Sequence, residues 1–280
     1  MTSARCEVCP HACRLVPGSL GACRARGNVN GRVLPLAYGR LTSIAIDPVE
    51  KKPLALWKPG STILSVGGYG CNLRCPWCQN ASISQVGESE VAWRSVLPEE
   101  LALLAAQAHE SDARMVGVAY TYNEPLVCWE YVRDAALFVR EAGLANALVS
   151  AGCVNRKVAE EVAPLLDAAN IDLKSIRAGT YASLGGDLRA TQRTIEILAC
   201  EPGCHLEVTT LVVPGVNDTP EEMEELSLWL ASVDPSIVLH VSRFFPAWRK
   251  TDVGPTPVAT VYALAEVARS NLRHVFTGNC

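Results

Sequence analysis

The sequence predicts an α/β fold, in which a partial (β/α)6-type TIM barrel follows a small cysteine-rich N-terminal subdomain. Short apolar runs alternate with segments of helical periodicity from residue 61 onward, a pattern typical of a parallel sheet with right-handed crossovers. Only six or seven such units are present, so an open barrel fits better than the eight-fold barrel of about 250 residues. Residues 1–58 are instead rich in loops and cysteines. We therefore expect two units, residues 1–58 and 59–280.

The expected elements of the barrel follow from these runs. Strands are predicted at residues 63–66, 116–120, 147–150, 170–173, 206–213, 237–241 and 274–277. Helices are predicted at residues 98–109, 125–142, 155–168, 188–200, 219–232 and 259–272. Asn123, Asn155 and Thr219 are candidate N-caps. In the N-terminal unit, residues 33–38 and 41–46 are expected to form a hairpin that turns at Gly39-Arg40.

Composition and charge exclude several classes of protein. The net charge is −4, and the basic residues are dispersed, so no nucleic-acid surface is expected. No apolar run approaches the ~20 residues that span a bilayer, and the N-terminus lacks the apolar core of a signal peptide. The twelve cysteines are clustered in a chain too long for a disulfide scaffold. They therefore favour metal or cluster binding in a reducing cytoplasm.

Three closely spaced cysteines, Cys71, Cys75 and Cys78, follow a short apolar run and a glycine-rich turn. Three thiolates on one loop can converge on a single iron–sulfur cluster. Because a [4Fe–4S] cube has four irons, three thiolates leave one iron open for a small molecule. The alternative is a structural zinc, or a disulfide with a spare thiol. Structural zinc usually pairs two ligands at one place with two from elsewhere in the chain.

This loop, with Trp77 directly before the last thiol, resembles the signature loop of radical S-adenosylmethionine (SAM) enzymes. The wider run 70–80 resembles the branch related to pyruvate formate-lyase activating enzyme, and it is most similar to the AmmeMemoRadiSam radical SAM enzymes. The resemblance implies that the three thiols hold a [4Fe–4S] cluster and that SAM chelates its open iron. Trp77 is then part of the cofactor site.

Polar residues at the ends of the predicted strands are candidates for binding SAM, because the chemistry of parallel barrels sits at these ends. Glu124 could accept hydrogen bonds from an ammonium group, and with Asn123 it resembles the family's substitute for its glycine-glycine-glutamate motif. Helix capping by Asn123 is compatible with that role. The hydroxyl of Ser150 could reach a ribose or a carboxylate, although a plain turn accounts for this position equally well.

Three later strands add further candidates. Alternation places Asp172 and Lys174 on one face, where Lys174 could bind the SAM carboxylate and Asp172 could orient it, bind ribose or hold a cation. A salt bridge at the rim of the sheet is the alternative. Thr209 could point inward from the next strand. His240 is either an adenosyl or substrate contact or a satisfied core histidine.

Four N-terminal cysteines, Cys6, Cys9, Cys13 and Cys23, have the right number for a four-cysteine zinc site or for a second iron–sulfur cluster. Their spacing does not distinguish the two. Of the remaining cysteines, Cys128 and Cys153 are expected to be buried as small apolar residues, and Cys200 and Cys204 are expected in a turn.

The function that the resemblance implies is reductive cleavage of SAM to a 5′-deoxyadenosyl radical, which abstracts hydrogen from a substrate. That substrate is either the glycyl residue of a partner enzyme or a small molecule. An electron donor such as flavodoxin or ferredoxin is an implied partner. The alternative is a non-catalytic iron–sulfur electron carrier or metal-binding protein, which would account for the cysteines but not for the charged residues at the strand ends.

Overall fold

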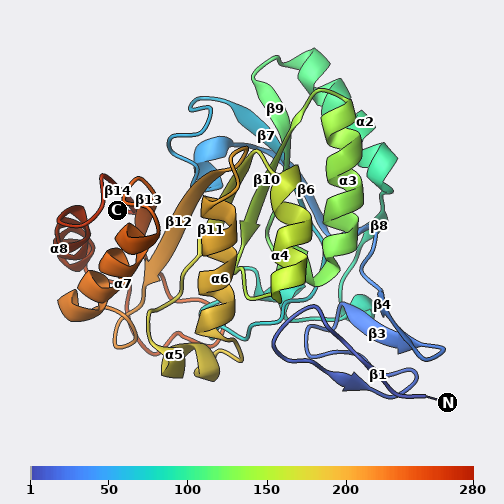
Figure 1. Ribbon diagram of the computed structural model, residues 1–280, viewed down its shortest axis with the longest axis horizontal. Helices are drawn as coiled ribbons and strands as arrows, with labels where there is room; N and C mark the ends of the chain where they lie inside the picture. The colour runs from blue at the N-terminus through green and yellow to red at the C-terminus, as the bar shows by residue number, and fades with distance from the viewer. Residues whose placement is uncertain (1) are drawn as a thin grey trace.

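The computed structural model describes residues 2–280 and is organised around one eight-stranded sheet (Figure 1). The strand order is β14-β13-β12-β11-β10-β9-β7-β6. Seven strands run parallel, in a partial barrel, and all seven were predicted: β7 (Thr62–Gly67), β9 (Met115–Tyr120), β10 (Ala145–Ser150), β11 (Ala168–Asp172), β12 (His205–Val212), β13 (Val238–Arg243) and β14 (His274–Gly278). The eighth, β6 (Ser43–Pro48), pairs antiparallel with β7.

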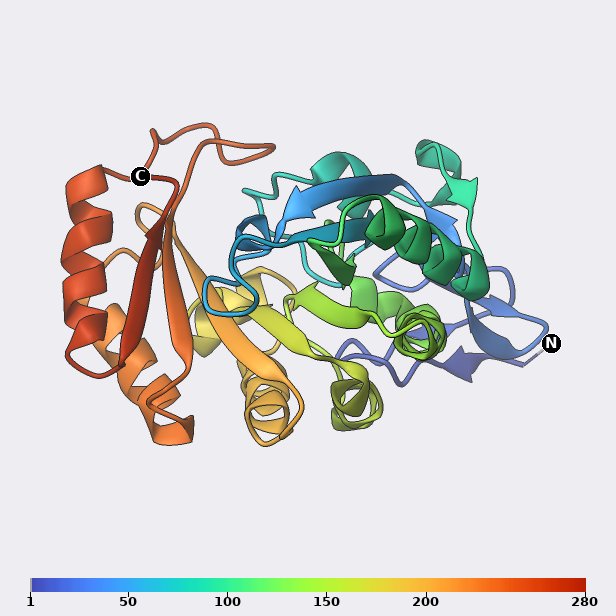
Figure 2. The same ribbon diagram turned by 90° about the horizontal axis from the view of Figure 1, so that it is seen from above.

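Six helices connect consecutive parallel strands and cover the outer face of the curved sheet (Figure 2). They are α2 (Pro98–Ser111), α3 (Trp129–Glu141), α4 (Arg156–Val162), α6 (Leu188–Ala199), α7 (Pro220–Val233) and α8 (Val258–Arg269). All six lie within or close to the predicted ranges, whereas the short helices α1 (Ala81–Ser84) and α5 (Ala178–Ser183) were not predicted. Within residues 2–280, none of the helices combines the length and the apolar character needed to cross a membrane.

The alternation of side chains along the strands separates the core from the inside of the barrel. Val208 on β12 and Leu239 on β13 are buried in the core beneath the helices. Their neighbours Thr209 and His240 face the opposite side and line a cavity. The same apolar residues that drive burial of the sheet therefore also orient the polar residues of the site.

The helix starts confirm one capping prediction and correct two. The Thr219 side chain accepts a hydrogen bond from the backbone N–H of Glu222 and caps α7, as predicted. Asn155 does not cap α4, because its carboxamide donates to the backbone carbonyl of Glu7. The turn after β9 is capped by Glu124 rather than by Asn123.

The N-terminal strands differ from the predicted hairpin. β4 (Arg32–Pro35) pairs with β3 (Arg26–Val29), not with residues 41–46. The reason is the Asn30-Gly31 turn, whose φ angles of +52° and +84° fit a two-residue hairpin of the type that asparagine and glycine favour. Residues 43–48 instead join the main sheet as β6.

Residues 49–57, here called the barrel plug, pack against the parallel strands. Val49, Leu54 and Trp57 pack against small side chains of the parallel strands, among them Ala119 and Ala147. The sheet and its plug thus both include residues that precede position 58, and the division into two units stays a prediction.

Candidate functional site

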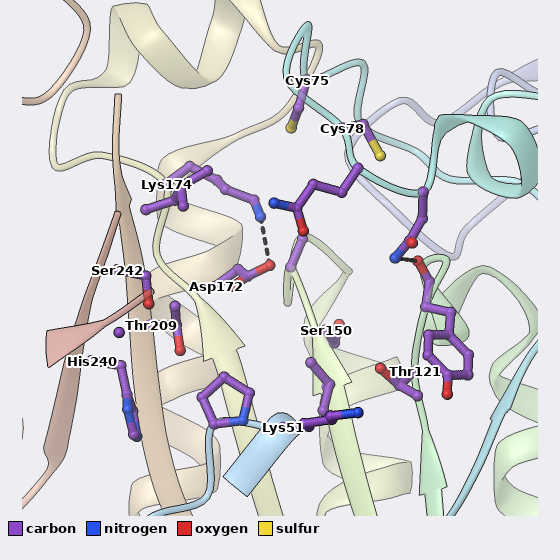
Figure 3. A pocket seen from close by; sticks show the side chains of 18 of the residues that line it. Lys51, Cys75, Cys78, Thr121, Ser150, Asp172, Lys174, Thr209, His240 and Ser242 are labelled. Atoms are coloured by element: carbon purple, nitrogen blue, oxygen red, sulfur yellow. Dashed lines mark hydrogen bonds and ion pairs between the residues drawn. The ribbon is translucent and has the colours of Figure 1, made fainter. Parts of the chain in front are cut away.

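A cavity of about 890 Å³ lies at the carboxyl ends of the parallel strands (Figure 3). Its lining includes every residue predicted for the main site: Cys71, Cys75, Trp77, Cys78, Asn123, Glu124, Ser150, Asp172, Lys174, Thr209 and His240. Five strand ends and one loop, far apart in the sequence, supply these side chains. The predicted strand-end residues therefore border one cavity, whose size lies in the range of ordinary small-molecule sites.

The cysteine loop begins directly after β7 and the glycine-rich turn. Cys71, Cys75 and Cys78 all line the cavity, and Trp77 is buried beside them in a small apolar cluster with Phe244. Burial, followed by the nearby Glu124, raises the pKa of Cys71 well above its usual value. Burial also raises the pKa of Cys75, to about 11. A cation near these sulfur atoms would favour their thiolate forms.

Asn123 holds the turn that leads into this loop. Its side-chain oxygen accepts the backbone N–H of Gly68 at 3.0 Å. Its nitrogen donates to the carbonyls of Tyr69 and Gly70, at 3.2 and 3.0 Å. The residue thus acts on the site through the turn, which positions Cys71.

Glu124 is a buried carboxylate that has already accepted three hydrogen bonds. Oε1 accepts from the Ser150 hydroxyl at 2.7 Å and from the backbone N–H of Leu126 at 3.0 Å, and Oε2 accepts from the N–H of Ala151 at 2.8 Å. Burial raises its pKa, and these donors oppose the effect. A carboxylate has about four acceptor positions, so Oε2 keeps one for an ammonium donor. The Ser150 hydroxyl donates to Glu124 and therefore orients this carboxylate.

Asp172 and Lys174 form an ion pair at the end of β11, with 2.5 Å between Asp172 Oδ2 and Lys174 Nζ (Figure 3). Burial lowers the pKa of Lys174, but Asp172 and Cys75 outweigh burial, and the net shift is upward. Lys174 is therefore a fixed cation that faces the cavity beside Cys75. An ammonium group has three N–H donors, so Lys174 can bind an anionic ligand while it keeps Asp172.

Thr209 lines the cavity, and its buried hydroxyl finds no hydrogen-bond partner among residues 2–280. Native proteins rarely leave such a buried group unpaired without a ligand or water. The hydroxyl is therefore a position where a bound polar molecule would be held.

His240 is fixed by a buried carboxylate on the neighbouring strand. Its Nε2 lies 2.5 Å from Glu207 Oε2, and its ring stacks on Phe276 with 5.8 Å between centroids. Burial favours the neutral form of Glu207, but His205, His240 and two backbone N–H groups lower its pKa to about 2. Because Glu207 is ionised, it accepts a hydrogen bond from His240 Nε2, and this bond fixes the orientation of the imidazole ring at the cavity.

Sequence reasoning missed one side of the cavity. Residues from the barrel plug, including Lys51 and Pro53, line it, as do Thr121, Tyr122 and Phe276. Tyr122 directly follows a predicted strand and a lining threonine, so the strand-end argument could have found it. Arg243, at the end of β13, donates to the carbonyl of Thr256 and is not among the lining residues.

All twelve cysteines are free thiols. Cys6, Cys9, Cys13 and Cys23 lie outside the cavity. Cys128 and Cys153 are buried, as predicted. Within residues 2–280, no three histidine, cysteine, aspartate or glutamate side chains converge closely enough to hold a single metal ion.

Comparison with known proteins identifies the family. The sequence model of the radical SAM superfamily matches residues 65–230. The chain belongs to the radical SAM superfamily. An uncharacterised protein of Methanocaldococcus jannaschii is 34% identical over 278 residues, which cover 98% of this chain and 81% of that protein.

Two solved structures are similar in fold. One is a domain of pyruvate-formate lyase-activating enzyme from Bacteroides vulgatus, with a TM-score of 0.50 and 17% identity, covering 59% of this chain and 99% of that one. The other is a radical SAM methyltransferase from Sphaerobacter thermophilus, with a TM-score of 0.58 and 16% identity, covering 78% and 66%. The expected partial radical SAM barrel is thus confirmed, and the superfamily implies SAM and a [4Fe–4S] cluster.

The residues of the cavity fit these two groups. Three free thiols of one loop face the same space as the unpartnered Thr209 hydroxyl and the Lys174 ammonium. A cubane takes each thiolate on a different iron, so its ligands lie further apart than those of one ion.

Proposed function

We propose that this radical SAM protein is an enzyme of the branch related to pyruvate formate-lyase activating enzyme, most similar to the AmmeMemoRadiSam enzymes. Cys71, Cys75 and Cys78 would hold the [4Fe–4S] cluster, and the strand ends would hold SAM. One arrangement carries this proposal: the three thiols share a cavity of about 890 Å³ with fixed charges and an unpaired hydroxyl. A protein that only carried electrons would not need a cavity of this size beside its cluster.

When bound, the reduced cluster and SAM supply methionine and a 5′-deoxyadenosyl radical, which takes a hydrogen atom from the substrate. The residues of the chain act on binding and orientation. Glu124 offers the remaining acceptor on Oε2 to the ammonium of SAM, and Lys174 binds its carboxylate. Thr209 and Asp172 would bind ribose hydroxyls, and Trp77 would support the cysteine loop from the small apolar cluster in which it is buried.

The part of the cavity furthest along the sheet from the cysteine loop is assigned to the substrate. It is lined by His240 and Ser242 of β13 and by Phe276 of β14. This lining combines an imidazole, a hydroxyl and an aromatic face. It would accept either a small molecule or the glycyl segment of a partner protein, with electrons supplied by a flavodoxin or ferredoxin. Twelve free thiols favour the reducing cytoplasm as the place of action.

The test is formation of 5′-deoxyadenosine by anaerobically reconstituted and chemically reduced protein. We expect SAM-dependent product from the wild type and none from Cys75→Ala, because that variant lacks one cluster ligand. Cys128→Ala, which removes a buried thiol outside the cavity, is the matched control and should keep activity. A reconstituted wild-type cluster that forms no product and does not respond to SAM would favour an electron carrier.

A further inference from the structure

The four N-terminal thiols are brought together by two neighbouring turns. Cys6 follows β1 (Ala4–Arg5) and Cys13 precedes β2 (Arg14–Leu15), and these strands pair antiparallel. The backbone N–H of Cys6 donates to the carbonyl of Cys13 at 2.9 Å, with Cys9 in the loop between them. The sulfur atoms of Cys13 and Cys23 both lie within 3.8 Å of the point where a side chain on Gly21 would begin. The group therefore comes from two loops and is not a single linear motif.

Backbone N–H groups point at the sulfur atoms of this group. The N–H of Ala22 donates to Cys13 Sγ at 3.4 Å. The backbone of His11 and the side chain of Asn72 form hydrogen bonds with the sulfur of Cys9, and the backbone of Ala25 and of Arg26 with that of Cys23. Cys71 receives the same kind of bond, from the N–H of Leu73 at 3.3 Å. Hydrogen bonds to sulfur are typical of thiolates that ligate metal clusters.

The segment has little else to hold it in one conformation. β1 and β2 have two residues each, and β3 and β4 have four each. Units of fewer than about 40 residues usually need a disulfide, a metal or a partner to be stable. Its cysteines are all free thiols, and Cys6, Cys9 and Cys23 are buried. A bound inorganic group would supply the missing stabilisation.

The group packs directly against the cysteine loop of the main site. His11 Nε2 lies 2.8 Å from the backbone oxygen of Asn72, the residue after Cys71. A side chain on Gly70 would begin 2.3 Å from the carbonyl oxygen of Cys23. A group bound by the four thiols would therefore stabilise the position of the cysteine loop from outside the cavity.

We propose that Cys6, Cys9, Cys13 and Cys23 bind a second [4Fe–4S] cluster that fastens the N-terminal segment to the cysteine loop. A cubane is favoured over zinc because no three of these side chains converge as the ligands of one ion do. The same is true of Cys71, Cys75 and Cys78 within the described residues 2–280. Four thiolates complete the cube, so this cluster would have no open iron and would not bind SAM.

The experiment uses the full chain with the first cluster removed. The triple variant Cys71→Ala/Cys75→Ala/Cys78→Ala leaves the N-terminal group intact, and we expect it to take up about four irons and four sulfides after anaerobic reconstitution, against about eight of each for the wild type. Its reduced form should show a [4Fe–4S] electron paramagnetic resonance (EPR) signal that does not change on addition of SAM. One zinc in place of iron, or no metal in a folded triple variant, would overturn the proposal.

A second variant tests the assignment from the other side. Cys6→Ser/Cys9→Ser should lose about four irons and keep the SAM-responsive signal. Cys200→Ser/Cys280→Ser removes two exposed thiols and should keep the full content. Retention of about eight irons by a folded Cys6→Ser/Cys9→Ser variant would contradict the inference. If the wild type and the triple variant both held about four irons, the function proposed for the cysteine loop would fail and this inference would stand.

Discussion

Substitution of Glu207 is the change that we expect to lower the free energy of unfolding most clearly. The Glu207 side chain is fully buried and accepts from His205 Nε2 and from the backbone N–H groups of Ala55 and Leu56, each at 2.9 Å, as well as from His240 at 2.5 Å. His240 ties β12 to β13, the N–H groups of Ala55 and Leu56 tie it to the barrel plug, and His205 lies on β12 itself. Glu207→Gln keeps the shape but removes the charge and turns an N–H₂ group toward one set of donors.

The size of the effect follows from the pKa of this carboxyl group. Folding lowers it from 4.5 to about 2, because the donors outweigh burial. Each pKa unit corresponds to 1.36 kcal/mol, so ionised Glu207 contributes about 3 kcal/mol of stability. The sign is that of a depressed acid. The contribution is complete above the unfolded pKa of 4.5 and is lost as the pH falls through the folded value near 2.

Urea unfolding of the cluster-free protein measures this directly. At pH 7 we expect Glu207→Gln to be less stable than the wild type by about 3 kcal/mol, with the difference shrinking toward pH 3. Glu110→Gln, which changes an exposed carboxylate, should show no difference at either pH. A Glu207→Gln variant within about 0.5 kcal/mol of the wild type at pH 7, or a deficit that ignores pH, would refute the reasoning.

Three further substitutions test the cavity and the loop. Thr209→Val removes a hydroxyl that has no partner among residues 2–280, so the free protein should keep or slightly gain stability. SAM should bind to this variant about tenfold more weakly, as measured by calorimetry. A loss of stability would show that the hydroxyl is already paired. Lys174→Met should weaken SAM binding about 10- to 100-fold in equilibrium dialysis, because a charge-assisted bond is lost, and unchanged affinity would exclude Lys174 from the carboxylate site. Gly70→Ala should destabilise the protein by at least about 2 kcal/mol in urea unfolding, because Gly70 has φ of +83° and no space beside Cys23; a stable variant would contradict the close packing of the two cysteine segments.

The barrel could be predicted from the sequence because its signals are local. Each parallel strand is a short apolar run, and Thr219-Pro220 marks a helix start through a hydrogen bond between Thr219 and Glu222, which are close in the chain. The N-terminal strands could not be paired in the same way. Residues 43–48 pair with β7, about twenty residues away in the chain, and no local pattern indicates that pairing. The Asn30-Gly31 turn, in contrast, is a local signal that would have predicted the β3–β4 hairpin.

The site shows the same division. The rule that parallel strands end at one edge brought Glu124, Lys174 and His240 to one cavity, although no local pattern links them. The plug residues that line the cavity were not predicted, because residues 49–57 precede the barrel and contact it only through tertiary packing. Glu124, and not the predicted Asn123, caps the turn after β9 for a similar reason. Asn123 is occupied by the glycine-rich turn, a contact more than fifty residues away in the chain.

The central claim is that the thiols of Cys71, Cys75 and Cys78 leave one iron free for SAM. Electron–nuclear double resonance on the reduced protein, with SAM labelled by ¹⁵N in its amino group and ¹⁷O in its carboxylate, measures that contact. We predict hyperfine coupling of both labels to the cluster, lost in Cys75→Ala. A fully formed cluster that couples to neither label would contradict it.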